Sequence, residues 1–202
     1  MALQVYADIL KINPNDFNTF NNIGIIFELI GDNNKAIEAY KQAVRINPNH
    51  AKSINNIGVV LYKQKKYKES AQIFEIALQV DENYFEVYSN KGAAYNKAKE
   101  YDKAIESLEM AILKMPNHGG AYTNLGNVYN KLHDYEKASK LHEKSIELEP
   151  NGSNAYSNLG TSYKYLGLSN KAISSYKKAI ELDPNFVNAH FDLATMYLAM
   201  ED

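Results

Sequence analysis

Histidine and asparagine are the side chains in this sequence with the clearest potential for chemistry. The five histidines are His50, His118, His133, His142 and His190. They form no His-Glu-x-x-His pair and no set of His, Asp and Glu at metal-ligand spacing. Cysteine is absent, which excludes disulfides, thiolate metal sites and cysteine nucleophiles. There is no glycine-rich phosphate loop either. The sequence therefore predicts a chain without catalytic residues, metal or cofactor.

Asparagines form a more regular pattern, because five of them recur at intervals of 34 residues. They are Asn22, Asn56, Asn90, Asn124 and Asn158. An amide side chain offers both hydrogen-bond donors and an acceptor. An evenly spaced row of amides could therefore hold an extended peptide backbone whatever its sequence.

Glycines follow the same interval, at Gly24, Gly58, Gly92, Gly126 and Gly160. If columns of a 34-residue repeat are counted from Phe17, these glycines occupy column 8 and the asparagines column 6. Apolar residues occupy columns 4, 7, 8 and 11, and again columns 20, 21, 24, 27 and 28. Both sets have the spacing of one helical face. Each repeat is therefore predicted to contain two amphipathic helices, with small residues in columns 8, 20 and 27 that let them approach.

A single pair of such helices cannot bury its apolar face, so neighbouring repeats must stack. We predict one array over residues 1–202, with full repeats at 17–50, 51–84, 85–118, 119–152 and 153–186. Residues 1–16 correspond to the second helix of a repeat, and residues 187–202 to the first. Because natural arrays usually end in a polar capping helix, we expect the chain to be part of a longer protein.

The repeat at 153–186 reads Tyr156-Ser157-Asn158-Leu159-Gly160-Thr161-Ser162-Tyr163, followed by Ala172, Tyr176, Ala179 and Pro184. This pattern resembles the tetratricopeptide repeat family, and the resemblance extends over the whole chain. It implies an all-α, right-handed solenoid of antiparallel helix pairs, about twelve helices in all. In this family the first helices line a concave groove, which usually holds the ligand.

The resemblance places a set of candidate ligand-binding residues on the first helices. Besides the five asparagines of column 6, they are Asn127, Lys52, Lys63, Lys97, Lys131, Tyr62 and Tyr165. The alternative is that the asparagines are a common feature of this column and that the lysines form a solvated face. Most other tyrosines occupy core columns. Lys91 and His142 replace apolar and aromatic residues, and we expect His142 in the core and Lys91 with its ammonium at the surface.

Charge favours a protein ligand over nucleic acid. The chain has a net charge of −2. Columns 1–14 carry six lysines against three acidic residues, so the first helices have a net charge of +3. A mildly basic groove favours an acidic peptide or a C-terminal carboxylate. Columns 5 and 6 contain no Lys or Arg, which excludes a carboxylate clamp, and the basic stripe that RNA binding requires is missing.

We therefore interpret the chain as a scaffold that binds a protein or an extended peptide. The alternative is the substrate-recognition arm of a larger glycosyltransferase whose catalytic domain lies outside this chain, because residues 188–194 resemble the last repeat before the catalytic region of such enzymes. No apolar run is long enough for a membrane span. The lack of cysteine fits a reducing compartment, and we expect a cytoplasmic protein.

The half repeats at the two ends are complementary to each other, because together they supply 32 of the 34 columns. We expect chains to stack head to tail through residues 1–16 and 187–202 at crystal concentrations. The contact area is one helix pair, so we expect a monomer in dilute solution.

Overall fold

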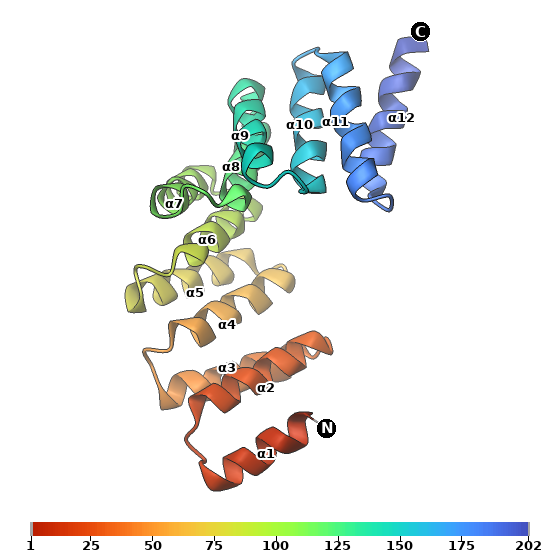
Figure 1. Cartoon of the computed structure of the whole chain (residues 1–202). Helices are drawn as coiled ribbons and strands as arrows, with labels where there is room; N and C mark the ends of the chain where they lie inside the picture. Colours follow the sequence, from red (N-terminus) through yellow and green to blue (C-terminus); the bar gives the residue numbers. More distant parts are fainter. Residues whose placement is uncertain (1, 202) are drawn as a thin grey trace. The chain divides into compact units, whose positions relative to one another are not determined.

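The computed structural model describes residues 2–201, and within them the chain forms twelve α-helices and no strand (Figure 1). The helices are α1 Ala2–Ile12, α2 Phe17–Leu29, α3 Asn33–Ile46, α4 Ala51–Lys63, α5 Tyr67–Val80, α6 Phe85–Lys97, α7 Tyr101–Lys114, α8 Gly119–Lys131, α9 Tyr135–Leu148, α10 Ser153–Tyr165, α11 Ser169–Leu182 and α12 Val187–Glu201. The predicted all-α fold of about twelve helices is confirmed, and its elements fall inside the predicted repeats.

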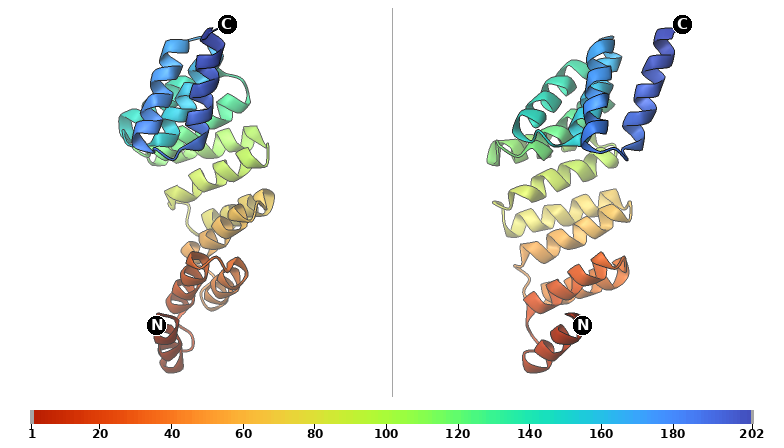
Figure 2. Two further views of the ribbon diagram at one scale, coloured as in Figure 1. Left: turned by 90° about the vertical axis from the view of Figure 1, so that its right-hand side faces the viewer. Right: turned by 45° about the vertical axis from the view of Figure 1, so that its right-hand side comes forward.

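The helices belong to two compact units, one that ends at Glu100 and one that begins at Tyr101. In the first unit α2 packs on α3 and α4 on α5, and α3 and α5 each contact the next repeat through α4 and α6. In the second unit α8 packs on α9 and α10 on α11, while α12 lies beside α11 (Figure 2). The repeat 85–118 contributes α6 to the first unit and α7 to the second. A single array over both units stays a prediction.

Column 8 is glycine because a ring from the second helix lies directly against it. A Cβ atom on Gly24 would lie 2.4 Å from a ring carbon of Tyr40, and one on Gly58 would lie 2.6 Å from a ring carbon of Phe74. Both rings are fully buried, so they have no space to move away. The expected approach of the two helices at small residues is thereby confirmed.

The turn between the two helices of each repeat has a left-handed residue in column 15. Glycine occupies this position at Gly31 and Gly167, with φ angles of +82° and +74°. In the other three repeats the residues are Lys65, Lys99 and His133, with φ angles near +62° to +63°. Side chains other than Gly and Asn adopt this conformation at a cost of about 1 kcal/mol. The sequence pattern predicted a polar turn here, but not this strain.

In three of the five full repeats a short polar side chain in column 31 closes the turn to the next repeat. The side-chain oxygens of Asn47, Asp81 and Asp183 accept hydrogen bonds of 3.0–3.1 Å from the backbone N–H two residues later. Asx turns of this kind compete with helix continuation. They explain why the second helices end where the sequence pattern predicts.

Candidate protein-binding face

The predicted ligand-binding residues lie on the first helices of the repeats. We use the name first-helix face for the side chains of columns 2, 6, 9, 12 and 13, on α2, α4 and α6 in one unit and on α8 and α10 in the other. The half-buried members of the predicted set are Asn22, Asn56, Tyr62, Asn90, Asn124, Asn127 and Asn158. The exposed members are Lys52, Lys63, Lys97, Lys131 and Tyr165.

In the first unit two of the three asparagines of column 6 are hydrogen-bonded across the repeats. Asn56 Nδ2 donates to Asn21 Oδ1 over 3.0 Å, and Asn90 Nδ2 donates to Asn55 Oδ1 over 3.2 Å. Asn21 and Asn55 occupy column 5 of the preceding repeat and are buried. Each bond uses one amide N–H and fixes the orientation of the other amide atoms. Column 5 was not among the predicted binding columns, although its polar residues follow the same 34-residue interval.

Asn21 is held in place by a second buried group. Its Oδ1 also accepts a hydrogen bond of 3.0 Å from Ser53 Oγ, which lies 2.8 Å from His50 Nδ1. Burial, followed by the nearby positive charge of Lys52, lowers the pKa of His50. The neutral ring can then share a hydrogen bond with Ser53. This network connects the start of α4 to the amide row.

Two of the lysines on this face are paired with acidic residues of the neighbouring first helix. Lys63 Nζ lies 2.6 Å from Glu28 Oε1, and Tyr40 donates to the other oxygen of this carboxylate over 2.9 Å. In the second unit Lys164 Nζ lies 3.7 Å from Asp192. The net charge of +3 counted from the sequence already includes these acidic residues, so the pairs show only where the charges are neutralised. The exposed lysines of this face that form no ion pair in residues 2–201 are Lys52, Lys97 and Lys131.

The two predicted aromatic residues both contact a tyrosine of column 17. Tyr62 makes an edge contact with Tyr67, with ring centroids 5.3 Å apart, and burial raises its pKa. Tyr165 is 61% exposed and stacks on Tyr135 at 4.6 Å. Tyr135 was missed by the sequence analysis because only the fold brings columns 13 and 17 of successive repeats together. Stacking fixes the ring of Tyr165 in an exposed orientation.

The structure offers this face little other chemistry. No group of three His, Asp or Glu side chains in the described part of the chain is placed to bind a metal ion. Among residues 2–201 no helix is both long enough and apolar enough to cross a membrane.

Family models identify the repeats directly. A model described as tetratricopeptide repeat matches residues 83–148 and 117–185, and related repeat models match residues 29–65, 51–84 and 175–202. The chain belongs to the tetratricopeptide repeat family. A comparison with curated protein sequences finds no match.

Three solved structures illustrate the similarity of this repeat protein to others of its fold. MamA is 27% identical, with a TM-score of 0.70 over 83% of this chain and 92% of its own. YrrB, whose title describes a TPR protein with an unusual peptide-binding site, is 21% identical, with a TM-score of 0.68 over 92% of this chain and 96% of its own. The Cut9-Hcn1 hetero-tetramer of the APC/C is 16% identical, with a TM-score of 0.87 over 100% of this chain and 40% of that chain.

Proposed function

We propose that this tetratricopeptide repeat scaffold binds an extended polypeptide along its first-helix face, through amide side chains that recognise the peptide backbone. The single observation that carries the proposal is the row of half-buried asparagines in column 6, one for each full repeat. YrrB, which has the same fold, is described as a TPR protein with an unusual peptide-binding site, and this supports a binding role over catalysis.

The cross-repeat hydrogen bonds separate two kinds of asparagine in this row. Asn56 and Asn90 each donate one N–H to a buried asparagine, so their removal affects both the fold and any ligand. Asn22 and Asn158 make no side-chain hydrogen bond within residues 2–201. These two residues therefore provide the cleaner test of ligand binding.

The test begins with an array of peptides about 15 residues long, from which a bound sequence is selected and its affinity measured. Asn22→Ala tests the unit that ends at Glu100, and Asn158→Ala tests the other unit. In the unit that holds the peptide, the variant should weaken binding about fivefold, at about 1 kcal/mol for the lost hydrogen bond. The controls are Asn34→Ala and Asn170→Ala, each of which removes an exposed asparagine from a second helix. Methylation of the peptide backbone nitrogens should abolish binding. Unchanged affinity in both Asn22→Ala and Asn158→Ala, or undiminished binding of the methylated peptide, would contradict the proposal.

Lys52, Lys97 and Lys131 support an acidic ligand, because they add unpaired positive charge to this face. Binding of the selected peptide should then weaken as the salt concentration rises.

Head-to-tail stacking through the two half repeats stays a prediction, which sedimentation over a range of concentrations would test. In the structure Leu193 packs against the core of α10 and α11, whereas Phe191 and Leu198 of α12 are exposed.

The glycosyltransferase alternative rests only on the short stretch at residues 188–194. No contact or pocket in the structure favours it over the binding scaffold.

A further inference from the structure

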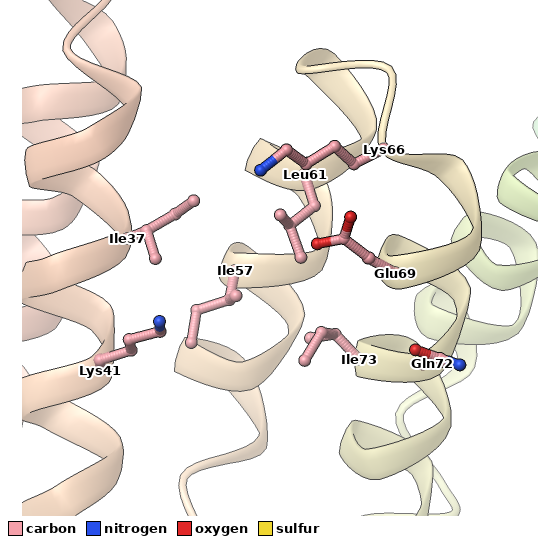
Figure 3. Close-up of a pocket in the computed structure, with 8 residues that line it drawn as sticks. All are labelled: Ile37, Lys41, Ile57, Leu61, Lys66, Glu69, Gln72 and Ile73. Carbon is pink, nitrogen blue, oxygen red and sulfur yellow. The ribbon is translucent and has the colours of Figure 1, made fainter.

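An apolar pocket of about 340 Å³ lies between α3, α4 and α5. Its inner wall consists of Ile57 and Leu61 from α4 together with Ile37 from α3 and Ile73 from α5 (Figure 3). Three charged side chains surround this wall, namely Lys41, Lys66 and Glu69. We call this site the α3–α5 pocket. Its volume lies at the lower end of the range for small ligand sites, which is enough for one or two side chains of a partner.

Column 11 of the α3–α5 pocket is Leu61. In the homologous groove of the second unit, column 11 is Tyr163, whose hydroxyl donates to Glu143 of α9 and whose ring lies 5.2 Å from Lys171 Nζ. The leucine side chain of Leu61 can form neither kind of contact with Lys41 or Glu69, which occupy the columns of Glu143 and Lys171. The sequence already shows this difference, since column 11 is aromatic in each other repeat.

The same substitution leaves Lys41 without a partner. Lys177 occupies the same column in α11, and its Nζ lies 5.7 Å from the ring centroid of Tyr197. Lys41 lines the pocket instead, and it forms no ion pair or ring contact within the described residues. Lys66, at the start of α5, is likewise unpaired there. The pocket therefore combines a buried apolar wall with two available ammonium groups.

The α3–α5 pocket is separate from the first-helix face. On a helix of 3.6 residues per turn, columns 7 and 11 point away from columns 6, 9 and 13. Ile57 and Leu61 thus lie on roughly the opposite side of α4 from Asn56 and Lys63. A ligand in this pocket would not compete with a peptide on the asparagine row.

We propose that the α3–α5 pocket binds a short acidic segment of a partner protein that carries an aliphatic residue. The aliphatic side chain packs on Ile57 and Leu61, and an adjacent carboxylate pairs with Lys41 and Lys66. The charge of the pocket favours an acidic ligand over a basic one, because its lining has two lysines and one carboxylate, that of the exposed Glu69. The apolar wall adds affinity through removal of its surface from water.

The test uses a fluorescent peptide with the sequence Gly-Asp-Glu-Leu-Leu-Asp-Glu-Gly and measures its binding by anisotropy. Lys41→Glu should weaken binding at least tenfold, and Glu69→Gln should strengthen it. Leu61→Tyr should also weaken binding at least tenfold, since it fills the pocket with the residue found at this column in three other full repeats. Thermal unfolding of Leu61→Tyr should occur at the same temperature or higher, which separates loss of the pocket from loss of the fold.

Matched controls locate the binding. Lys177→Glu changes the same column of another repeat, and Asn22→Ala/Asn158→Ala changes the first-helix face, so neither should alter the affinity for this peptide. A peptide with serine in place of both leucines, or with amides in place of its acids, should lose the binding that Leu61→Tyr removes. The proposal is overturned by absence of binding at millimolar peptide, by full binding to Leu61→Tyr, or by equal binding of the amide peptide.

Discussion

Repeats 51–84 and 119–152 have the same backbone but different interiors. In the first, Phe74 packs on Gly58, with both side-chain positions apolar. In the second, His142 takes the place of the phenylalanine and packs on Gly126, with ring atoms 2.6 Å from where a Cβ would lie. Ser145 occupies column 27, which is alanine in the other full repeats, and its hydroxyl forms hydrogen bonds with Thr123 and Gly119. A ring in column 24 is thus sufficient for the packing of the helix pair. Whether the stability of the repeat depends on pH is decided by whether that ring can bind a proton.

The imidazole of His142 makes this difference measurable. Its Nε2 lies 3.3 Å from Asn130 Nδ2, which can only donate, while Nδ1 is buried without a partner in the described structure. Nε2 must therefore accept, and the ring must be neutral. Burial lowers the pKa of His142 to about 4. The unfolded chain binds a proton near pH 6.5, so stability falls as the pH drops from about 6.5 to 4.

The largest expected effect is therefore an acid sensitivity that His142→Phe removes. The shift in pKa corresponds to about 3 kcal/mol of unfolding free energy between pH 7 and pH 4. On going from pH 7 to pH 4, the natural chain should lose about 3 kcal/mol more unfolding free energy than His142→Phe. Urea unfolding of both proteins at the two pH values measures this difference. The reciprocal change Phe74→His should introduce the same sensitivity into the other repeat. A pH-independent difference between His142→Phe and the natural chain would refute the assignment.

The shared geometry can be broken at the glycines. Gly58→Ala and Gly126→Ala each place a Cβ within 2.6 Å of a buried ring. We expect each to lower the free energy of unfolding by about 2 kcal/mol, since overpacking outweighs the helix propensity of alanine. Gly152→Ala is the control, because its nearest contact would be an ordinary 3.4 Å. Thermal unfolding should show a smaller loss for the control, and equal losses for all three would contradict the packing argument.

A smaller loss of unfolding free energy is expected for Ser145→Ala in the polar interior of repeat 119–152. Its hydroxyl lies 2.7 Å from Thr123 Oγ1 and donates to the carbonyl of Gly119 over 2.9 Å. Ser145→Ala restores the alanine of the other full repeats, yet it should cost about 1 kcal/mol because these bonds are lost. A cycle with Thr123→Val isolates the hydroxyl pair. Additive losses in denaturant unfolding would show that the two hydroxyls do not interact.

The smallest effect is expected at Lys91 in the repeat 85–118. Lys91 occupies column 7, which is Ile57 and Leu125 in the two repeats compared above. Its side chain is 15% exposed, and its Nζ lies 3.2 Å from Glu75 Oε2 and 5.9 Å from the ring centroid of Tyr88. Lys91→Leu exchanges a weak surface pair for apolar burial, so stability should change by less than about 0.5 kcal/mol. Affinity for the peptide selected on the first-helix face should also be unchanged. A leucine variant that folds normally and loses the peptide would place Lys91 among the ligand contacts.

Much of the fold could be predicted from local patterns. The 34-residue interval gave the helices and their bounds, because Gly58 and Phe74 are already complementary within one repeat. The column 6 asparagines could be placed on the first helices for the same reason. Their hydrogen-bond partners could not be predicted, because the bond between Asn56 and Asn21 joins residues 35 positions apart in adjacent repeats. The charge count included Lys63 and Glu28, but it could not show that they pair, for the same reason.

The sequence by itself determined the repeat, its two amphipathic helices and the row of amides, because periodic burial and turn chemistry act over a few residues. Only the tertiary structure decided which polar groups remain available to a ligand. Hydrogen bonds and ion pairs between repeats form when helices from different repeats meet, and they use donors and charges that the sequence leaves unassigned. The pocket beside Leu61 has the same origin, since an open space results from what three helices together fail to fill.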